Sequence, residues 1–238
     1  MLASTTSAAL QGIDALPVTV EANGGEKGEP RCVLVGLPDA AVKEALDRVN
    51  SSISNSGFAL PRTKVTINMA PGDLKKEGAS FDLPIALALL AACGNFQGSG
   101  VDDFLIAGEL GLSGEVRGIR GGLAMAVLAR KLGKKGIILP HDSAWEASLV
   151  EGLSVYPVKS LAETVDFLSG KHKISALIKE NCPYFSSNAD SFDVDFNEIK
   201  GQLNLKRAVE ISVCGGHNML IIGPPGSGKS MVAKRIPT

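Results

Sequence analysis

Runs of hydrophobic residues along the chain predict strands and helices in alternation. Short runs rich in β-branched and aliphatic residues predict strands, at residues 16–22, 31–36, 64–69, 104–107, 136–139 and 153–157. Apolar residues at helical spacing, or segments apolar on every side, predict helices, at residues 42–53, 82–93, 122–132, 142–150 and 161–168. This alternation favours a layered fold, and we assign the chain to the α+β (mixed α/β) class.

Three local signals refine this picture. Residues 23–30 are rich in glycine and charge, so we expect the strands on either side of them to form a hairpin. A second, glycine-punctuated hairpin is expected at residues 108–118. Asp82 stands before an apolar helix, so we expect its side chain to cap that helix, with Pro84 in the first turn.

The character of the chain changes after residue 168. Residues 169–195 are polar, aperiodic and interrupted by Pro183, which is typical of an interdomain linker. We therefore divide the chain into an N-terminal domain at residues 1–170, a linker at 171–192 and a second domain at 193–238. In the second domain we expect a helix at 202–214, a short apolar strand at 219–222, a glycine-rich loop and the start of another helix.

The glycine-rich loop carries the motif with the clearest chemistry. Its sequence, GPPGSGKS, matches the phosphate-binding pattern GxxxxGK[ST]. Glycines let the backbone N–H groups turn toward phosphate oxygens, and the next helix presents its N-terminus to them. We expect Lys229 to reach the β- and γ-phosphates of ATP, and the hydroxyl of Ser230 to ligate Mg²⁺. The predicted nucleotide site consists of Gly223, Pro224, Pro225, Gly226, Ser227, Gly228, Lys229 and Ser230.

The alternative is a glycine-rich turn that binds no ligand. Binding is also not hydrolysis, which requires an acidic residue to hold the metal and a group to position the water. Both belong to later segments of such domains. We therefore expect no significant ATPase activity from this chain alone, and we expect the nucleotide to act in a longer parent protein.

Composition excludes several classes of protein. The net charge of −1 gives no global electrostatic case for nucleic-acid binding, and aromatic residues at 5% do not suggest a platform for stacking bases. The four cysteines include no CxxC pair, so neither zinc nor a disulfide framework is expected. We find no signal peptide and no apolar run near the roughly 20 residues that span a membrane, so we expect a cytoplasmic protein without membrane contact.

Four segments together resemble the YifB/ComM family of magnesium-chelatase-like AAA+ ATPases. They are GLPDAAVKEALDRV, NMAPGDLKKEGASFDLPIALALL, GELGLSGEVRGIRGG and DFNEIKGQLNLKRAVEISVCGGHNMLIIGPPGSGKS. The resemblance implies a bacterial homo-hexameric, ATP-driven DNA motor that promotes branch migration in natural transformation. It also implies that Ile199, Gly201 and Gln202 flank the adenine, the alternative being a plain turn before a helix.

The N-terminal domain resembles the catalytic domain of Lon proteases around residues 75–83 and 114–124. Ser80 stands where Lon-type enzymes carry the nucleophilic serine, but the position of the catalytic lysine is Ala124. A serine hydroxyl needs a base to become a nucleophile, and alanine cannot supply one. We therefore expect no catalytic residue in this chain, and a domain that contacts DNA or forms a ring without proteolysis.

Basic residues of this domain are candidates for DNA contact, with phosphates as the expected partners. They are Lys75, Lys76, Arg117, Arg120, Arg130, Lys131, Lys134 and Lys135. The alternative is a solvated face, with lysines placed favourably at a helix C-terminus. The leading hypothesis is an ATP-dependent DNA motor. The alternatives are a magnesium-chelatase-type subunit that remodels a protein partner, a Lon-like peptidase, and a structural assembly domain.

Overall fold

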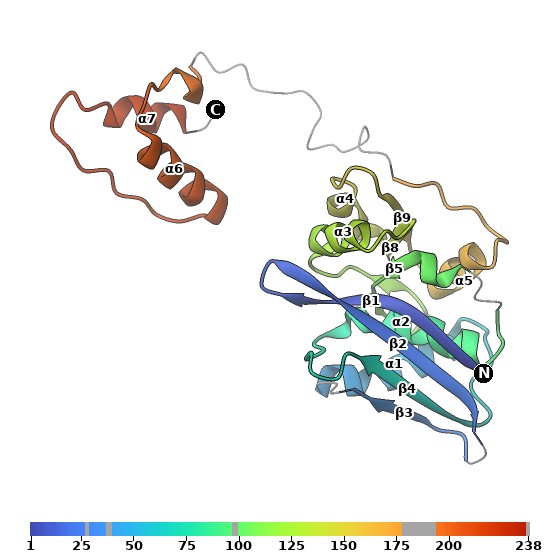
Figure 1. Cartoon of the computed structure of the whole chain (residues 1–238). Coiled ribbons are helices and arrows are strands. Elements are labelled where there is room, and N and C mark those ends of the chain that lie inside the picture. The colour runs from blue at the N-terminus through green and yellow to red at the C-terminus, as the bar shows by residue number, and fades with distance from the viewer. Residues whose placement is uncertain (27–28, 37–39, 97–99, 178–193, 237–238) are drawn as a thin grey trace. The chain divides into compact units, whose positions relative to one another are not determined.

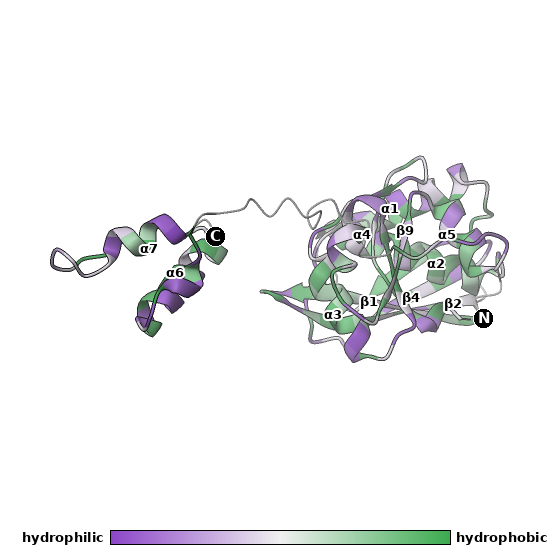
Figure 2. Ribbon diagram, turned by 90° about the horizontal axis from the view of Figure 1, so that it is seen from above, coloured by the Kyte–Doolittle hydropathy of each residue, from purple (hydrophilic) through white to green (hydrophobic). Residues whose placement is uncertain are grey.

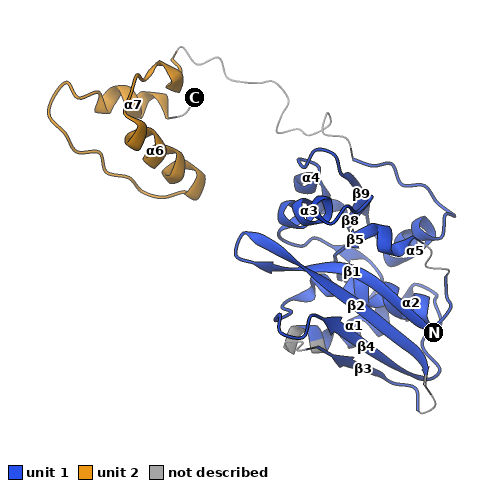
Figure 3. Ribbon diagram, viewed as in Figure 1, with its two compact units in different colours: residues 1–182 blue, residues 183–238 orange. Residues whose placement is uncertain are grey.

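The chain forms two compact units. The computed structural model describes residues 1–26, 29–36, 40–96, 100–177 and 194–236, and its contacts divide the chain into Met1–Cys182 and Pro183–Thr238 (Figure 3). Most of the linker predicted at 171–192 lies outside the described residues. Its first part packs on unit 1, where the Leu177 N–H donates to the Val155 carbonyl at 2.8 Å.

Unit 1 is built on a seven-stranded mixed sheet in the order β3-β4-β2-β1-β5-β8-β9 (Figure 1). Antiparallel pairing joins β1 to β2 and β2 to β4, and the other neighbours in this sheet are parallel. A separate antiparallel ribbon joins β6 and β7. The strands are β1 (Leu2–Gln11), β2 (Asp14–Glu26), β3 (Cys32–Val35), β4 (Lys64–Ala70), β5 (Phe104–Ile106), β6 (Glu109–Leu110), β7 (Val116–Arg117), β8 (Gly136–Pro140) and β9 (Ser154–Val158).

Two hydrophobic clusters lie on opposite faces of this sheet. Successive residues of a strand point to opposite faces, and Ile137 and Ile138 accordingly belong to different clusters. One cluster includes residues of α1, α2 and α5, and the other includes residues of α3 and α4. The helices of unit 1 are α1 (Ala40–Asn55), η1 (Ala79–Phe81), α2 (Asp82–Ala92), η2 (Val101–Asp103), α3 (Gly122–Lys131), α4 (His141–Ala147) and α5 (Leu161–Leu168).

The burial pattern of each strand follows from the helices beside it. All five residues of β8 are buried, whereas β4 alternates between buried and half-buried positions. A strand covered by helices on both faces needs apolar residues throughout, and a strand covered on one face needs them at every second position. The predicted mixed α/β class is confirmed.

The hairpin predicted between residues 16–22 and 31–36 is wrong. The strand β2 pairs with β1 and with β4, and β3 instead runs parallel to β4. No hydrophobic pattern predicted β1, whose segment LASTTSAALQ is rich in small hydroxyl residues. Two of these are nevertheless buried, and the Thr5 hydroxyl donates to the Pro84 carbonyl at 3.1 Å.

The capping role predicted for Asp82 is also wrong. Asp82 is the first residue of α2, and its N-cap residue, Phe81, makes no capping hydrogen bond with its side chain. The Asp82 carboxylate is fully buried and pairs with Arg48. A buried carboxylate requires a cation more than a helix requires a cap, because an unpaired charge in the interior is far more costly.

Unit 2 consists of η5 (Phe196–Glu198), α6 (Leu203–Gly215) and α7 (Lys229–Arg235). The strand predicted at residues 219–222 does not form in this structure. A strand needs a neighbour for its backbone hydrogen bonds, and the described part of unit 2 offers no other strand. Leu220 and Ile222 are therefore exposed, at 82% and 85%.

Candidate nucleotide-binding site

The loop at residues 223–230 leads directly into α7. Gly226 and Gly228 have φ angles of 82° and 84°, a conformation that side chains strongly disfavour. A Cβ atom added at Gly226 would meet no other atom within 4 Å, so the loop is open to solvent at this point. Gly228 is the residue before the helix, and Lys229 begins it.

Lys229 is held inside this loop. Its Nζ donates to the carbonyl oxygens of Gly223 and Pro224, both at 2.7 Å, and to the Ser227 hydroxyl at 3.3 Å. These three acceptors show that the ammonium lies where loop oxygens converge. The loop thus places one positive charge at the start of a helix, and this arrangement suits a phosphate group.

Ser230 is the second residue of α7 and is exposed, so its hydroxyl is accessible to a ligand. A hydroxyl next to a phosphate-binding lysine has the chemistry of the magnesium ligand in such loops. The residues present therefore fit Mg²⁺ together with a nucleotide.

The segment expected to flank the adenine lies directly before α6 in the same unit. Ile199 is 1% exposed and packs with Val209 of α6 and Val232 of α7, so it serves as a core residue. Gly201 and Gln202 are exposed and both adopt positive φ angles, of 67° and 56°. Among the described residues, Gln202 is the one non-glycine residue with a positive φ angle.

An ion pair ties this segment to α7. Arg235 donates to the Glu198 carboxylate from Nε at 3.0 Å and from a terminal guanidinium nitrogen at 2.5 Å. Together with the cluster around Ile199, this pair fixes η5 against α7, the helix that follows the loop at residues 223–228. The contact is formed by residues far apart in sequence, and no local pattern predicted it.

Ser80 lines a cleft of about 1080 Å³ in unit 1, between the loop at residues 73–80 and the segment at 118–120. Ala124, in the position expected for a catalytic lysine, lines a different hollow. Lys76 is close to Ser80 in sequence, but it is fully buried and donates to the Pro71 carbonyl. Within the described residues, the Ser80 hydroxyl makes no hydrogen bond to a side chain that could act as its base.

Lys76, a candidate for DNA contact, is not exposed in this structure. Its side chain is fully buried, and burial lowers the pKa of its ammonium, while Asp73 opposes this shift. Lysine has a long apolar stem, and in this loop the stem is covered together with the ammonium. Lys76 is therefore not available to a DNA phosphate in this structure.

Most of the other basic candidates are partnered within unit 1. Lys75 pairs with Glu77, and Lys135 pairs with Asp103 at 2.6 Å. Lys134 donates to the Asp102 carbonyl at 2.6 Å. Arg117 and Arg130 also have partners, respectively the Glu115 carboxylate and the Glu151 carbonyl.

Arg120 and Lys131 differ from this group. Neither has an ion pair or a side-chain hydrogen bond to any described residue. A phosphate would meet Arg120 or Lys131 without first displacing an internal partner. The two residues line different hollows, so the structure does not gather the basic candidates into one patch.

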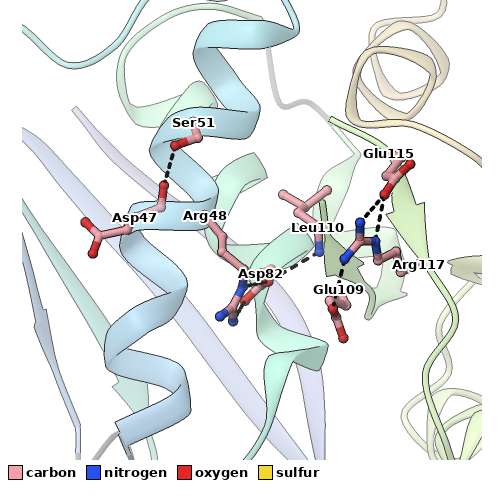
Figure 4. A network of polar contacts seen from close by, with 8 residues as sticks. All are labelled: Asp47, Arg48, Ser51, Asp82, Glu109, Leu110, Glu115 and Arg117. Carbon is pink, nitrogen blue, oxygen red and sulfur yellow. Dashed lines mark hydrogen bonds and ion pairs between the residues drawn. The ribbon is translucent and has the colours of Figure 1, made fainter. Parts of the chain in front are cut away.

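A buried ion pair, which the sequence analysis did not identify, fixes the start of α2. Arg48 of α1 donates to both Asp82 oxygens, at 2.9 and 3.1 Å, and the Leu110 N–H donates to the same carboxylate at 3.3 Å (Figure 4). Burial raises the pKa of Asp82, while Arg48 and the Leu110 N–H oppose that rise and nearby Glu109 adds to it. The pair thus joins α1, α2 and β6 next to the cleft.

Within the described ranges, no three His, Cys, Asp or Glu residues lie together as a metal site. In the same part of the chain, no helix combines the length and the apolar character that crossing a membrane requires.

Comparison with known proteins identifies the family. A family model described as subunit ChlI of Mg-chelatase matches residues 20–143, and a model of magnesium chelatase, subunit ChlI, matches residues 195–238. The chain is 44% identical to the uncharacterized protein YifB of Escherichia coli over 231 residues, which are 97% of the chain and 44% of YifB. It is 41% identical to the competence protein ComM of Haemophilus influenzae over 238 residues, which are 99% of the chain and 46% of ComM.

Part of the chain is also similar, at lower identity, to the DNA repair protein RadA of Aquifex aeolicus. The two are 33% identical over 104 residues, which are 44% of the chain and 22% of RadA. The chain spans less than half the length of YifB and of ComM. The two chelatase models and the near-complete matches agree, and the chain belongs to the magnesium-chelatase ChlI-like family of AAA+ proteins that includes YifB and ComM.

Proposed function

We propose that this chain provides the phosphate-binding loop and an N-terminal platform of an ATP-dependent, DNA-processing motor. The observation that carries this proposal is the loop at residues 223–230, which holds the Lys229 ammonium among loop oxygens at the start of α7. Relatives named for competence and for DNA repair support DNA as the partner. We further propose a homo-hexamer that acts as a branch-migration helicase.

Each residue of the loop has a distinct task in this proposal. Gly226 and Gly228 allow the backbone to curve, so that its N–H groups face phosphate oxygens. Lys229 would donate to the β- and γ-phosphate oxygens of ATP in place of the loop carbonyls, and the Ser230 hydroxyl would ligate Mg²⁺. The Mg²⁺–ATP complex supplies a transferable phosphoryl group. The acidic and water-positioning groups for hydrolysis would come from other parts of the assembly.

Nucleotide binding is tested with a protein of the relatives' full length that contains this chain. We expect Lys229→Ala to weaken Mg²⁺–ATP binding by at least about 100-fold, because the loop loses its charge. The matched control is Lys234→Ala, which removes the same charge from an exposed position of the same helix. An unaltered protein with no affinity for nucleotide, or a Lys229→Ala variant with unchanged affinity, contradicts the proposal.

DNA binding is tested with branched and single-stranded DNA at several salt concentrations. We expect Arg120→Ala to weaken binding and to reduce the salt dependence by about one counterion, because Arg120 has no internal partner to give up. Lys135→Ala is the control, since its ammonium is engaged by Asp103. Equal effects of the two substitutions would argue against this placement of the DNA.

A second function is favoured by the internal pairing of most of the basic candidates in unit 1. Side chains that are already paired are less available to DNA phosphates, and both matching family models are chelatase subunits. The alternative is therefore an AAA+ subunit that remodels a protein partner. ATP turnover that is unaffected by DNA, in a full-length protein that binds no DNA at moderate salt, would favour this alternative.

A further inference from the structure

The tip of the β1–β2 hairpin presents a large apolar side chain to solvent. Gln11 pairs with Asp14, so the turn consists of Gly12 and Ile13. Gly12 has a φ angle of 63° and Ile13 does not have a positive φ angle, the pattern of a type II′ turn. Such turns favour small polar residues, yet Ile13 is 93% exposed. The geometry of the turn gives no reason for an isoleucine at this position.

An apolar groove lies directly beside this tip. The hairpin lies beside α3 (Figures 1 and 2), and residues of both line the groove, whose volume is about 420 Å³. Leu10 and Leu123, which are 44% and 43% exposed, contribute to its walls. Leu10 lies so close to Gly121 that a Cβ atom there would approach its side chain to 2.7 Å. Contiguous exposed apolar residues of this kind mark interaction surfaces.

Opposite charges flank the groove. Asp14 lines it from the hairpin, and Lys131 lines it from the end of α3. Neither side chain has an ion pair or hydrogen bond to a described residue. Asp14 and Lys131 are therefore available to pair with charges on another molecule.

We propose that this surface binds the same surface of a second copy of the chain, around a two-fold axis. A two-fold interface joins a surface to itself, so it needs a projection beside a groove and opposite charges on one surface, and this surface carries all four. In the pair, Ile13 of each copy enters the groove of the other, and Asp14 of each copy faces Lys131 of the other. This contact is independent of the nucleotide site.

Sedimentation of the 238-residue chain tests the proposal. A contact of this small size predicts a reversible dimer with a dissociation constant on the order of 10 µM. Ile13→Ser, which places a common turn residue in an exposed turn, should raise that constant at least about 10-fold. A chain that remains monomeric up to about 200 µM would overturn the proposal, since a weak specific dimer is populated well below that concentration.

Charge reversal tests the two-fold geometry. Asp14→Lys or Lys131→Glu alone should weaken the dimer, and the double variant should restore it, because the two charges then exchange places. The control is Ile222→Ser, which makes the same substitution at an exposed isoleucine of unit 2. Dissociation caused by Ile222→Ser but not by Ile13→Ser, or no recovery in the double variant, would refute the proposed contact.

Discussion

Two loops of this chain lead into helices, and each contains a lysine that donates its ammonium to loop carbonyls. In the loop at residues 71–78, Lys76 bonds the Pro71 carbonyl and is fully buried. In the loop at residues 223–228, the Lys229 ammonium bonds the Gly223 and Pro224 carbonyls, and the loop around it is largely exposed. The same donor and the same type of acceptor therefore occur in two different environments.

The difference shows how the surroundings of a lysine decide what it does. Water is excluded around Lys76, so exchanging its one internal acceptor for a ligand would require the loop to open. The acceptors of Lys229 lie in an open loop, where a phosphate can replace them at little cost to the fold. The first loop is stabilised by its lysine, and in our proposal the second presents its lysine for binding.

The helix that follows the first loop gives the largest expected effect. Arg48→Met removes the cation from the buried Asp82 carboxylate, and we expect a loss of about 3 kcal/mol in the free energy of unfolding at pH 7. Urea unfolding followed by the fluorescence of Trp145, the single tryptophan of the chain, reports on unit 1. Asp82→Asn in the same background should recover part of the loss, because it removes the stranded charge.

The loss of stability in Arg48→Met should depend on pH. Burial raises the pKa of Asp82 above its ordinary value of 3.8 in the folded state, and without Arg48 that pKa rises further. A folded state that binds a proton more readily than the unfolded state gains stability as the pH falls through the folded pKa. The deficit of Arg48→Met should therefore shrink on acidification toward 3.8. A deficit that is constant with pH would show that lost packing, and not the charge, is responsible.

Lys76→Ala gives the next largest effect and tests the first loop directly. It removes a fully buried side chain and leaves the Pro71 carbonyl without its donor, so we expect a loss of about 2 kcal/mol. The neighbouring variant Lys75→Ala is the control, because it breaks an exposed pair with Glu77 and should cost less than about 0.5 kcal/mol. Equal effects at the two positions would contradict the contrast between buried and exposed lysines.

Lys76→Met isolates the charge of this lysine from its packing. Burial lowers the pKa of Lys76 below 10.5 in the folded state, so the unfolded chain binds the proton more readily. Wild-type stability should therefore rise, relative to Lys76→Met, as the pH increases through the lowered pKa toward 10.5. Parallel unfolding measurements of the two proteins between neutral and alkaline pH reveal this difference. If the difference in stability between wild type and Lys76→Met does not change with pH, the Lys76 ammonium is solvated in the folded state.

The second loop is easier to predict from the sequence than the first. The predicted phosphate-binding motif is one continuous segment, with its glycines, lysine and serine at fixed spacing. The burial of Lys76 and the Arg48–Asp82 pair depend on contacts made after folding, and the two residues of the pair stand 34 positions apart. Local patterns carry no information about such partners.

The predicted strands are those whose own hydrophobic pattern reveals their burial. The strand β8 is apolar throughout and β4 alternates, so their sequences reveal them. The strand β1 carries Thr5 and Ser7 at buried positions, and a pattern of small hydroxyl residues resembles a loop until its neighbours are known. The segment at 219–222 shows the reverse case, since its apolar sequence predicts a strand but the described part of unit 2 offers it no partner strand.

Lys229→Ala gives the smallest expected effect on stability and completes the comparison. Its ammonium bonds oxygens of an open loop that water can also satisfy, so the free energy of unfolding should change by less than about 0.5 kcal/mol. The single tryptophan lies in unit 1. The free energy of unfolding of unit 2 is therefore best followed by amide hydrogen exchange in α6 and α7. Unchanged exchange, together with lost affinity for Mg²⁺–ATP in the full-length protein, would show that Lys229 binds the ligand and does not stabilise the fold. Faster exchange throughout α6 would instead place Lys229 with Lys76, as a residue that the fold itself requires.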